Sequence, residues 1–300
     1  IDADSDAFAQ AYVIVERYKD SVQRAKSLLI LPESDPANLY PKVWGSSYDI
    51  SGKINLELNT APNLAGLDKN YHIEGIRHKW KVDGQWQTEW QLWDVNGYRV
   101  FASNAYDGYI GYEGGTYEDY PTVHDPASGN IVDAAGTWMR VGQQSQSDIG
   151  LGVYRVYRGY VNFVTSAIGA GATIAKAYLL LYIAGEFAVD NNWTLTVVPA
   201  TNVGYALNLA DYGDMLDDIT SYGSIAIATP TVNATILVIE LNANGIAAIN
   251  KTGTTHFGLR SSRDISSTSP GSVNEKEFID LSTSEGVFPP RLVVKLNEVF

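Results

Sequence analysis

The sequence predicts a mainly β protein with antiparallel strands, and three observations lead to that prediction. Side chains in Tyr154–Val164 and Thr173–Ile183 alternate between two faces with a period of two. Both runs are rich in β-branched and aromatic residues, which favour strands. The small-residue segment Thr165–Ala172 separates them and supplies Gly169 and Gly171 for a turn. We therefore expect a core β-hairpin here, inside an antiparallel β domain.

Length and composition indicate how large a core the chain can bury and which partners it is unsuited to bind. The chain has 300 residues, 45% hydrophobic and 18% charged, so it can bury a substantial core and exceeds one average domain. A net charge of −13 argues against nucleic-acid backbones and anionic membranes as partners. No apolar run is long enough to insert into a bilayer. Cysteine is absent, which excludes disulfides and thiolate metal sites.

The first 97 residues are expected to form a small α+β domain. Asp4 or Ser5 suits the N-cap of a helix, although the β-branched run Val13–Val15 fits a strand equally well. Asp83 and Gly84 form a strong hairpin turn signal between two alternating runs. The strands expected in this domain lie within Ser21–Leu31, Asp49–Leu58 and, around that turn, Tyr71–Trp93.

Short motifs in this first domain resemble the closing section of bacteriophage minor tail proteins. They are Asp35-Pro36, Leu39–Pro41, Ile73–His78 and Gln85–Trp93. In that family a longer N-terminal part precedes this section, whereas this chain begins at Ile1 without a signal-like segment. We therefore expect a processed product or part of a longer protein. The resemblance implies a tail-anchoring domain, 1–97, that contacts neighbouring tail subunits.

Residues 98–300 are expected to form a second, β-rich domain. A loop-rich region precedes a strand over Thr137–Val141, and a short helix is expected over Ala243–Ile249. The other strands expected after the hairpin are Trp193–Pro199, Ile225–Ala228, Thr235–Leu241, Thr255–Arg260 and Arg291–Leu296.

This second domain is similar to β-sandwich modules of the DNRLRE or carbohydrate-binding type. The matching segments are Tyr157–Phe163, Gly171–Ile183, Phe257–Asp264 and Pro289–Leu296. The resemblance implies an antiparallel jelly-roll β-sandwich. Its functions range from glycan binding to passive display, so function depends on the site and not on the fold.

Aromatic side chains before the hairpin are the best candidates for a ligand-binding surface. Flat aromatic faces stack on sugar rings, and acidic or amide neighbours can bond the hydroxyl groups. The alternatives for the tyrosine-rich segment are a contact between subunits and a self-packed loop. The predicted ligand-binding residues are Tyr106, Tyr109, Tyr112, Tyr117, Tyr120 and Trp138.

Metal binding has weaker support. His72, Glu74 and His78 share one strand face, but the two histidines would lie about 20 Å apart along a strand, too far to share an ion. The acidic stretch Asp211–Asp218 loosely suggests a structural calcium ion, yet it lacks the loop length and closing Glu of a specific calcium motif. Metal ligands therefore stay unknown, and we expect no other cofactor.

No catalytic residue is predicted. A glycosidase needs two carboxylates at a set separation, and the acids Glu113, Glu118, Asp119 and Asp125 are spaced like ordinary solvated loop residues. Nucleophile-elbow, zinc-protease and phosphate-loop motifs are absent from the sequence. For the two arginines in the matched strands, Arg158 and Arg260, we expect a structural pairing with Asp264 or Asp280.

These expectations combine into a non-enzymatic, extracellular virion tail protein. Its β-sandwich would bind host-surface polysaccharide, and its partners would be other tail subunits in a homo-oligomer. The alternative is a secreted polysaccharide-binding module or polysaccharide-degrading enzyme of a cellular organism. A third is a virion component without a ligand.

Overall fold

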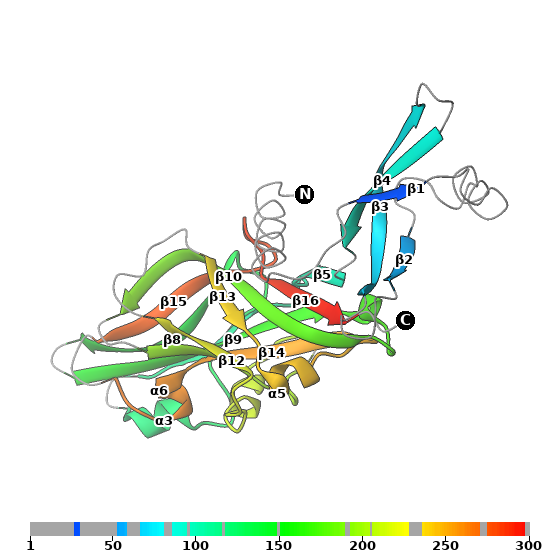
Figure 1. Cartoon of the computed structure of the whole chain (residues 1–300). Helices are drawn as coiled ribbons and strands as arrows, with labels where there is room; N and C mark the ends of the chain where they lie inside the picture. The colour runs from blue at the N-terminus through cyan, green and yellow to red at the C-terminus, as the bar shows by residue number, and fades with distance from the viewer. Residues whose placement is uncertain are drawn as a thin grey trace. The chain divides into compact units, whose positions relative to one another are not determined.

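The structure is a computed structural model, and Figure 1 shows the chain. It describes residues 27–30, 53–58, 67–80, 86–94, 97–115, 118–148, 151–189, 193–204, 206–227, 236–270 and 275–297. Two compact units make up the chain: Glu16–Asn96, and Gly97–Phe300 together with Ile1–Val15. The helix expected after Asp4 or Ser5 lies outside the described residues.

The smaller unit contains a four-stranded antiparallel sheet in the order β1-β4-β3-β2. Its two longest strands, β3 and β4, pair from Tyr71 opposite Asp94 to Trp80 opposite Trp86, so the two strands predicted on either side of Asp83 and Gly84 are confirmed. A bulge interrupts their register between Ile73 and Gly75. The strand bounds are β1 Ser27–Ile30, β2 Lys53–Leu58, β3 Leu67–Trp80 and β4 Trp86–Asp94.

The larger unit confirms the mainly β fold class. Its described residues form a 12-stranded sheet with the main order β12-β11-β14-β9-β8-β15-β10-β16-β5, while β13 pairs with β10, and β6 pairs with β7 and β9. The strands are β5 Gly97–Ala102, β6 Gly108–Glu113, β7 Ile131–Asp133, β8 Trp138–Asp148, β9 Leu151–Val164, β10 Thr173–Val189, β11 Trp193–Val198, β12 Gly223–Ile227, β13 Ile236–Glu240, β14 Thr254–Ser261, β15 Lys276–Ser282 and β16 Arg291–Asn297. The short helices are α3 Tyr120–His124, α4 Asp211–Asp214, α5 Ala243–Ala247 and α6 Ser262–Ile265.

The predicted core hairpin is wrong, although both of its strands are present. Strand β9 pairs with β6, β8 and β14, whereas β10 pairs with β13, β15 and β16. The connection contains a 3₁₀ turn, Ser166–Ile168, and is tied elsewhere: Thr165 Oγ1 donates to the Asn250 carbonyl at 2.6 Å, and the Gly169 amide to the Lys251 carbonyl at 2.9 Å. The two strands therefore do not pair with each other, although side chains of both belong to the same apolar core.

One apolar core joins the two ends of the sheet. Ile227 of β12 and Leu292 of β16 belong to the same buried cluster, together with Val161 of β9 and Leu179 of β10. A flat sheet would hold its end strands far apart, because neighbouring strands are about 4.8 Å apart. The sheet must therefore fold back on itself around this core. The jelly-roll strand arrangement stays a prediction.

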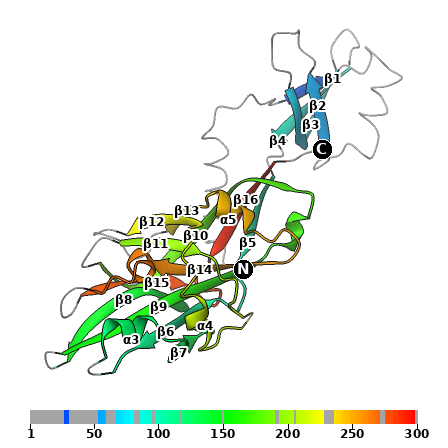
Figure 2. The same cartoon turned by 90° about the horizontal axis from the view of Figure 1, so that it is seen from below.

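A second apolar cluster lies on the other face of β9. Val156 and Tyr160 pack there with Ile110 of β6, Tyr212 of α4 and Met215. Helices α3 and α4 both contact β6, and Figure 2 shows them beside it. This layer of short helices covers the polar side chains of β9 and thereby sets the position of a buried ionic cluster.

Three short strands, β6, β7 and β15, were not predicted, and β8 runs beyond Val141 into a polar stretch. That stretch can be buried because its side chains are bonded: Gln143 donates to the Thr268 carbonyl at 2.8 Å and to Glu277 at 3.2 Å. Alternation of apolar residues does not detect such a strand. Within the described residues, none of the helices has the length and apolar character needed to cross a membrane.

Candidate functional site

The structure divides the predicted aromatic residues between two places. Tyr109 and Trp138 stack with ring centroids 5.7 Å apart and planes at 13°. Trp138 is 37% exposed, whereas Tyr109 beneath it is 9% exposed. Tyr106 is also exposed, and Tyr117 lies outside the described residues. Trp138 therefore presents an aromatic ring to solvent on a buried aromatic support.

Tyr112 and Tyr120 belong to the second apolar cluster instead. The Tyr120 hydroxyl donates to Gln143 Oε1 at 2.8 Å, and its ring packs edge-on against Tyr154 with centroids 5.7 Å apart. The Tyr112 ring packs tilted against Tyr212, with centroids 6.3 Å apart. Packing accounts for both side chains, and neither lies in the stacked pair of Tyr109 and Trp138.

The guanidinium of Arg140 lies over the ring of the exposed tryptophan. Its guanidinium carbon lies 5.2 Å from the centroid of the Trp138 ring and 4.1 Å from that of Phe278. Asp280 accepts two hydrogen bonds from it, at 2.7 Å from Nε and 2.8 Å from Nη2. A two-bond carboxylate pair fixes the plane of a guanidinium, which in turn limits the motion of the rings against it. We call Tyr109, Trp138 and Arg140 the Trp138 platform.

The loops around the Trp138 platform are cross-linked. Thr283 donates from Oγ1 to the Gly136 carbonyl at 2.5 Å and from its amide to the Thr137 carbonyl at 3.3 Å. Asp133 Oδ1 accepts from the Gly136 amide at 2.8 Å. Burial raises the pKa of the Tyr109 hydroxyl, and the negative charge of Asp133 adds to this rise. An ordered aromatic face with an acidic side chain close by is suited to an apolar ring that carries hydroxyl groups.

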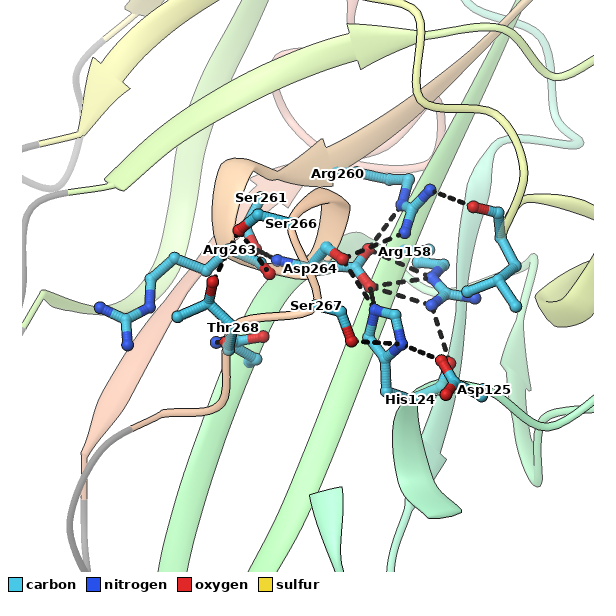
Figure 3. Close-up of polar contacts among 12 residues, drawn as sticks. His124, Asp125, Arg158, Arg260, Ser261, Arg263, Asp264, Ser266, Ser267 and Thr268 are labelled. Carbon is cyan, nitrogen blue, oxygen red and sulfur yellow. Dashed lines mark hydrogen bonds and ion pairs between the residues drawn. The ribbon is translucent and has the colours of Figure 1, made fainter. Parts of the chain in front are cut away.

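A buried ionic cluster is the other concentration of chemistry in the larger unit (Figure 3). Asp264, in α6, is fully buried and accepts from Arg158 Nη2 at 2.9 Å and from Arg260 Nε at 2.6 Å. The predicted pairing of both arginines with Asp264 is thereby confirmed. The other acid considered for this pairing, Asp280, binds Arg140.

Backbone carbonyl groups satisfy the remaining guanidinium hydrogens. Arg158 donates to the carbonyls of Tyr212 at 2.6 Å and His124 at 3.0 Å, and Arg260 donates to that of Met215 at 2.8 Å. Burial alone would raise the pKa of Asp264. The two guanidinium groups outweigh burial and hold that pKa well below its ordinary value. The cluster therefore ties β9, β14, α6 and the segment after α4 together.

His124 and Ser267 extend the cluster towards the surface, and their arrangement resembles a serine triad only superficially. His124 Nε2 lies 3.0 Å from Asp264 Oδ1, Nδ1 contacts Asp125, and Ser267 Oγ lies 3.5 Å from Nδ1 (Figure 3). Burial lowers the pKa of His124, but its bonds to Asp264 and Asp125 outweigh this and raise it. A general base must be neutral at the nitrogen that faces the nucleophile. A histidine whose cationic form is favoured by two carboxylates suits cross-linking better.

The loop acids considered as a catalytic pair each have a separate structural partner. Glu113 accepts from the Tyr157 hydroxyl at 2.7 Å, and Glu118 from the Gly115 amide at 2.7 Å. Asp119 caps α3 by accepting from the Thr122 amide at 3.0 Å, and Asp125 contacts His124. These contacts fix local loop conformation.

The residues considered for metal binding also have other bonds. In the Asp211–Asp218 stretch, Asp211 accepts from the Asn208 amide at 2.7 Å and from the Gly204 amide at 3.2 Å. His78 Nδ1 lies 2.9 Å from Thr88 Oγ1, while the side chains of His72 and Glu74 are outside the described part. In the described part of the chain, no group of three or more His, Asp or Glu side chains is placed to hold a metal ion.

Neither the family models nor the curated proteins compared with this chain match its sequence. The site is therefore interpreted from its geometry. The sequence pattern drew attention to Trp138 but not to Arg140, whose partner Asp280 is 140 positions away, or to Asp107, whose partner Ser284 is 177 positions away. No local spacing signals such contacts.

Proposed function

We propose that this chain is a non-catalytic adhesion protein that binds host-surface polysaccharide through the Trp138 platform. The observation that carries the proposal is the exposed, stacked ring of Trp138, which contacts the Tyr109 ring and the Arg140 guanidinium. A ring that is ordered before binding loses little conformational freedom when a sugar stacks on it. In a multimer, several weak sites that bind at the same time would give a high overall affinity.

The virion tail is the location that we propose. Its support is the resemblance of residues 1–97 to minor tail proteins, with the larger unit as the displayed, ligand-binding part. Contacts with other tail subunits, and a homo-oligomer, belong to the same proposal. Electron microscopy of particles labelled at this chain tests it: label at the tail supports the proposal, and label on secreted protein alone overturns the tail location.

A binding experiment tests the adhesive part. Host cell-wall fractions are incubated with the wild-type chain, with Trp138→Ala and with Ile219→Ala, which removes a 58% exposed apolar side chain from another loop. Truncating an aromatic anchor typically costs about 2 kcal/mol or more, which is roughly thirty-fold in affinity. We expect that loss for Trp138→Ala and unchanged binding for Ile219→Ala.

Two results would overturn the adhesive function. One is that the wild-type chain binds no host fraction, and the other is that Trp138→Ala binds as well as wild type. If the chain released reducing ends from the bound polysaccharide, its function would be hydrolysis and not adhesion. That assay separates the proposal from a polysaccharide-degrading enzyme, because an adhesion protein releases no sugar.

A further inference from the structure

A second buried carboxylate, Asp107, lies directly before β6 and has only neutral hydrogen-bond donors. It is fully buried. The Ser284 amide donates to both of its oxygens, at 3.1 and 3.0 Å, and Ser284 Oγ donates to Oδ1 at 2.8 Å. The buried Ser103 hydroxyl acts on the same carboxyl at a geometry too poor for a hydrogen bond. Asp107 forms no ion pair within the described part of the chain.

The hydrogen bonds between Asp107 and Ser284 connect the loops that surround the Trp138 platform. Asp107 stands two residues before Tyr109, and Ser284 stands next to Thr283, which bonds the Gly136 and Thr137 carbonyls directly before Trp138. Strand β15 also pairs Ser282 with Trp138. The loop 283–287 thus connects the segment that carries Tyr109 to the segment that carries Trp138, and Asp107 is its attachment on the Tyr109 side.

The charge state of Asp107 must affect this attachment. Burial raises the pKa of Asp107 to about 6, while the nearby Ser103 hydroxyl and the hydrogen bonds from Ser284 lower it, and the negative charge of Glu285 raises it further. When the loop is open, the carboxyl meets water and regains an ordinary pKa near 3.9. A group with a higher pKa in the closed state binds its proton more tightly there. Protonation therefore favours closure, and ionisation above pH 6 favours opening.

The closed geometry can accommodate the proton. A protonated Asp107 still accepts from the Ser284 amide through its carbonyl oxygen, and its O–H can donate to the hydroxyl of Ser103 or Ser284. The Ser103 hydroxyl otherwise lacks a hydrogen-bond partner in the described part of the chain. Protonation thus removes a buried unpaired charge and lets the carboxyl donate a hydrogen bond, so no bond of the closed loop is lost.

We propose that Asp107 is a proton-operated latch that holds the loop 283–287 against the start of β6 and so orders the Trp138 platform. The latch is tighter at acidic pH and looser above neutrality. Its effect on ligand binding rests on the proposed function, whereas the latch itself does not. Glycan binding at this surface is then strongest in mildly acidic surroundings.

Hydrogen exchange of the Ser284 amide, which donates to Asp107, tests the latch directly. Exchange of the wild-type chain is measured from pH 5 to pH 8 and corrected for the intrinsic pH dependence of exchange. A carboxyl pKa of about 6 in the closed loop, against its ordinary value when open, corresponds to as much as about 100-fold in the closing equilibrium. Part of that change lies below pH 5, so we expect protection at Ser284 to fall about tenfold between pH 5 and pH 8.

Asp107→Asn keeps the shape of the side chain without the charge. Its amide can donate to a serine hydroxyl while its oxygen accepts from Ser284, so we expect high protection at every pH. Asp125→Asn, at a carboxylate in another loop, is the matched control and keeps the wild-type pH response. If the Asn variant does not fold, Ser284→Ala serves instead: it lowers protection at residue 284 and leaves the direction of the pH response unchanged.

The latch is overturned if wild-type protection does not fall with rising pH, or if Asp107→Asn loses protection as wild type does. A parallel arm measures binding of the host cell-wall fraction at pH 5 and pH 8. Wild type is expected to bind more tightly at pH 5, and Asp107→Asn equally at both. A pH-dependent Ser284 amide in a chain that binds no host fraction would support the latch and overturn only the proposed function.

Discussion

Asp264 and Asp107 are both fully buried carboxylates in the larger unit, yet their surroundings shift their pKa values in opposite directions. Asp264 meets two guanidinium groups and a histidine, which hold its pKa well below the ordinary value despite burial. Asp107 meets one serine amide and hydroxyl groups, so burial raises its pKa to about 6. Burial by itself does not decide the charge state of an acid. The charge of the groups around it does.

The difference separates a fixed structural element from a responsive one. Around Asp264 the ionised form is favoured at every physiological pH, and the cluster cross-links four parts of the chain (Figure 3). Around Asp107 ionisation opposes closure, so the contact changes in the range where Asp107 titrates. The first arrangement stabilises the fold, and the second suits regulation of the surface beside it.

The largest expected effect comes from removing the charge at the structural carboxylate. Asp264→Asn leaves two buried guanidinium groups without a counter-charge, and breaking a buried pair in this way costs about 3–5 kcal/mol. We expect a loss of that size in the free energy of unfolding, measured by urea denaturation at pH 7. A loss below about 1 kcal/mol would show that the backbone carbonyls alone compensate Arg158 and Arg260.

Arg140→Gln should leave a third buried carboxylate, that of Asp280, without a cationic partner. Asp280, 3% exposed, would lose its guanidinium partner. Losing hydrogen bonds to a charged group costs about 1.5–3 kcal/mol at pH 7. We expect a loss of that size in the free energy of unfolding of the variant at pH 7.

Urea denaturation at pH 7 measures the effect of Arg140→Gln. The control is Arg155→Gln, which removes a partly exposed ion pair with Glu113 at 3.7 Å. That variant should lose less than about 1 kcal/mol, because water screens such a pair. Equal losses in the two variants would contradict the role assigned to burial.

The smallest effect is expected at the exposed end of the ionic cluster. The Asp125 side chain is 57% exposed although it contacts the buried His124. Exposed ion pairs contribute about 0–1 kcal/mol, so Asp125→Asn should change the free energy of unfolding by no more than that. Thermal denaturation at pH 7 measures it. A larger loss would place Asp125 with Asp264 as part of the structural cross-link.

Local sequence patterns predicted those parts of the molecule whose partners are close in the chain. The alternation that predicted strands near Tyr154–Val164 and Arg291–Leu296 reflects which side chains face the core, and those strands are present. The pairing of Arg260 with Asp264 spans four positions, and it was expected. The paired strands around Asp83 and Gly84 are likewise local.

The sequence by itself determined the mainly β class, most strand positions, and the aromatic and ionic residues to consider. Tertiary structure decided which of them act together. It separated β9 from β10, placed Trp138 on Tyr109 and gave Asp107 neutral neighbours. The physical reason is that a residue's own pattern specifies whether it is buried, whereas strand pairing, stacking and carboxyl charge depend on partners that the local pattern does not identify, such as Ser284, 177 positions from Asp107.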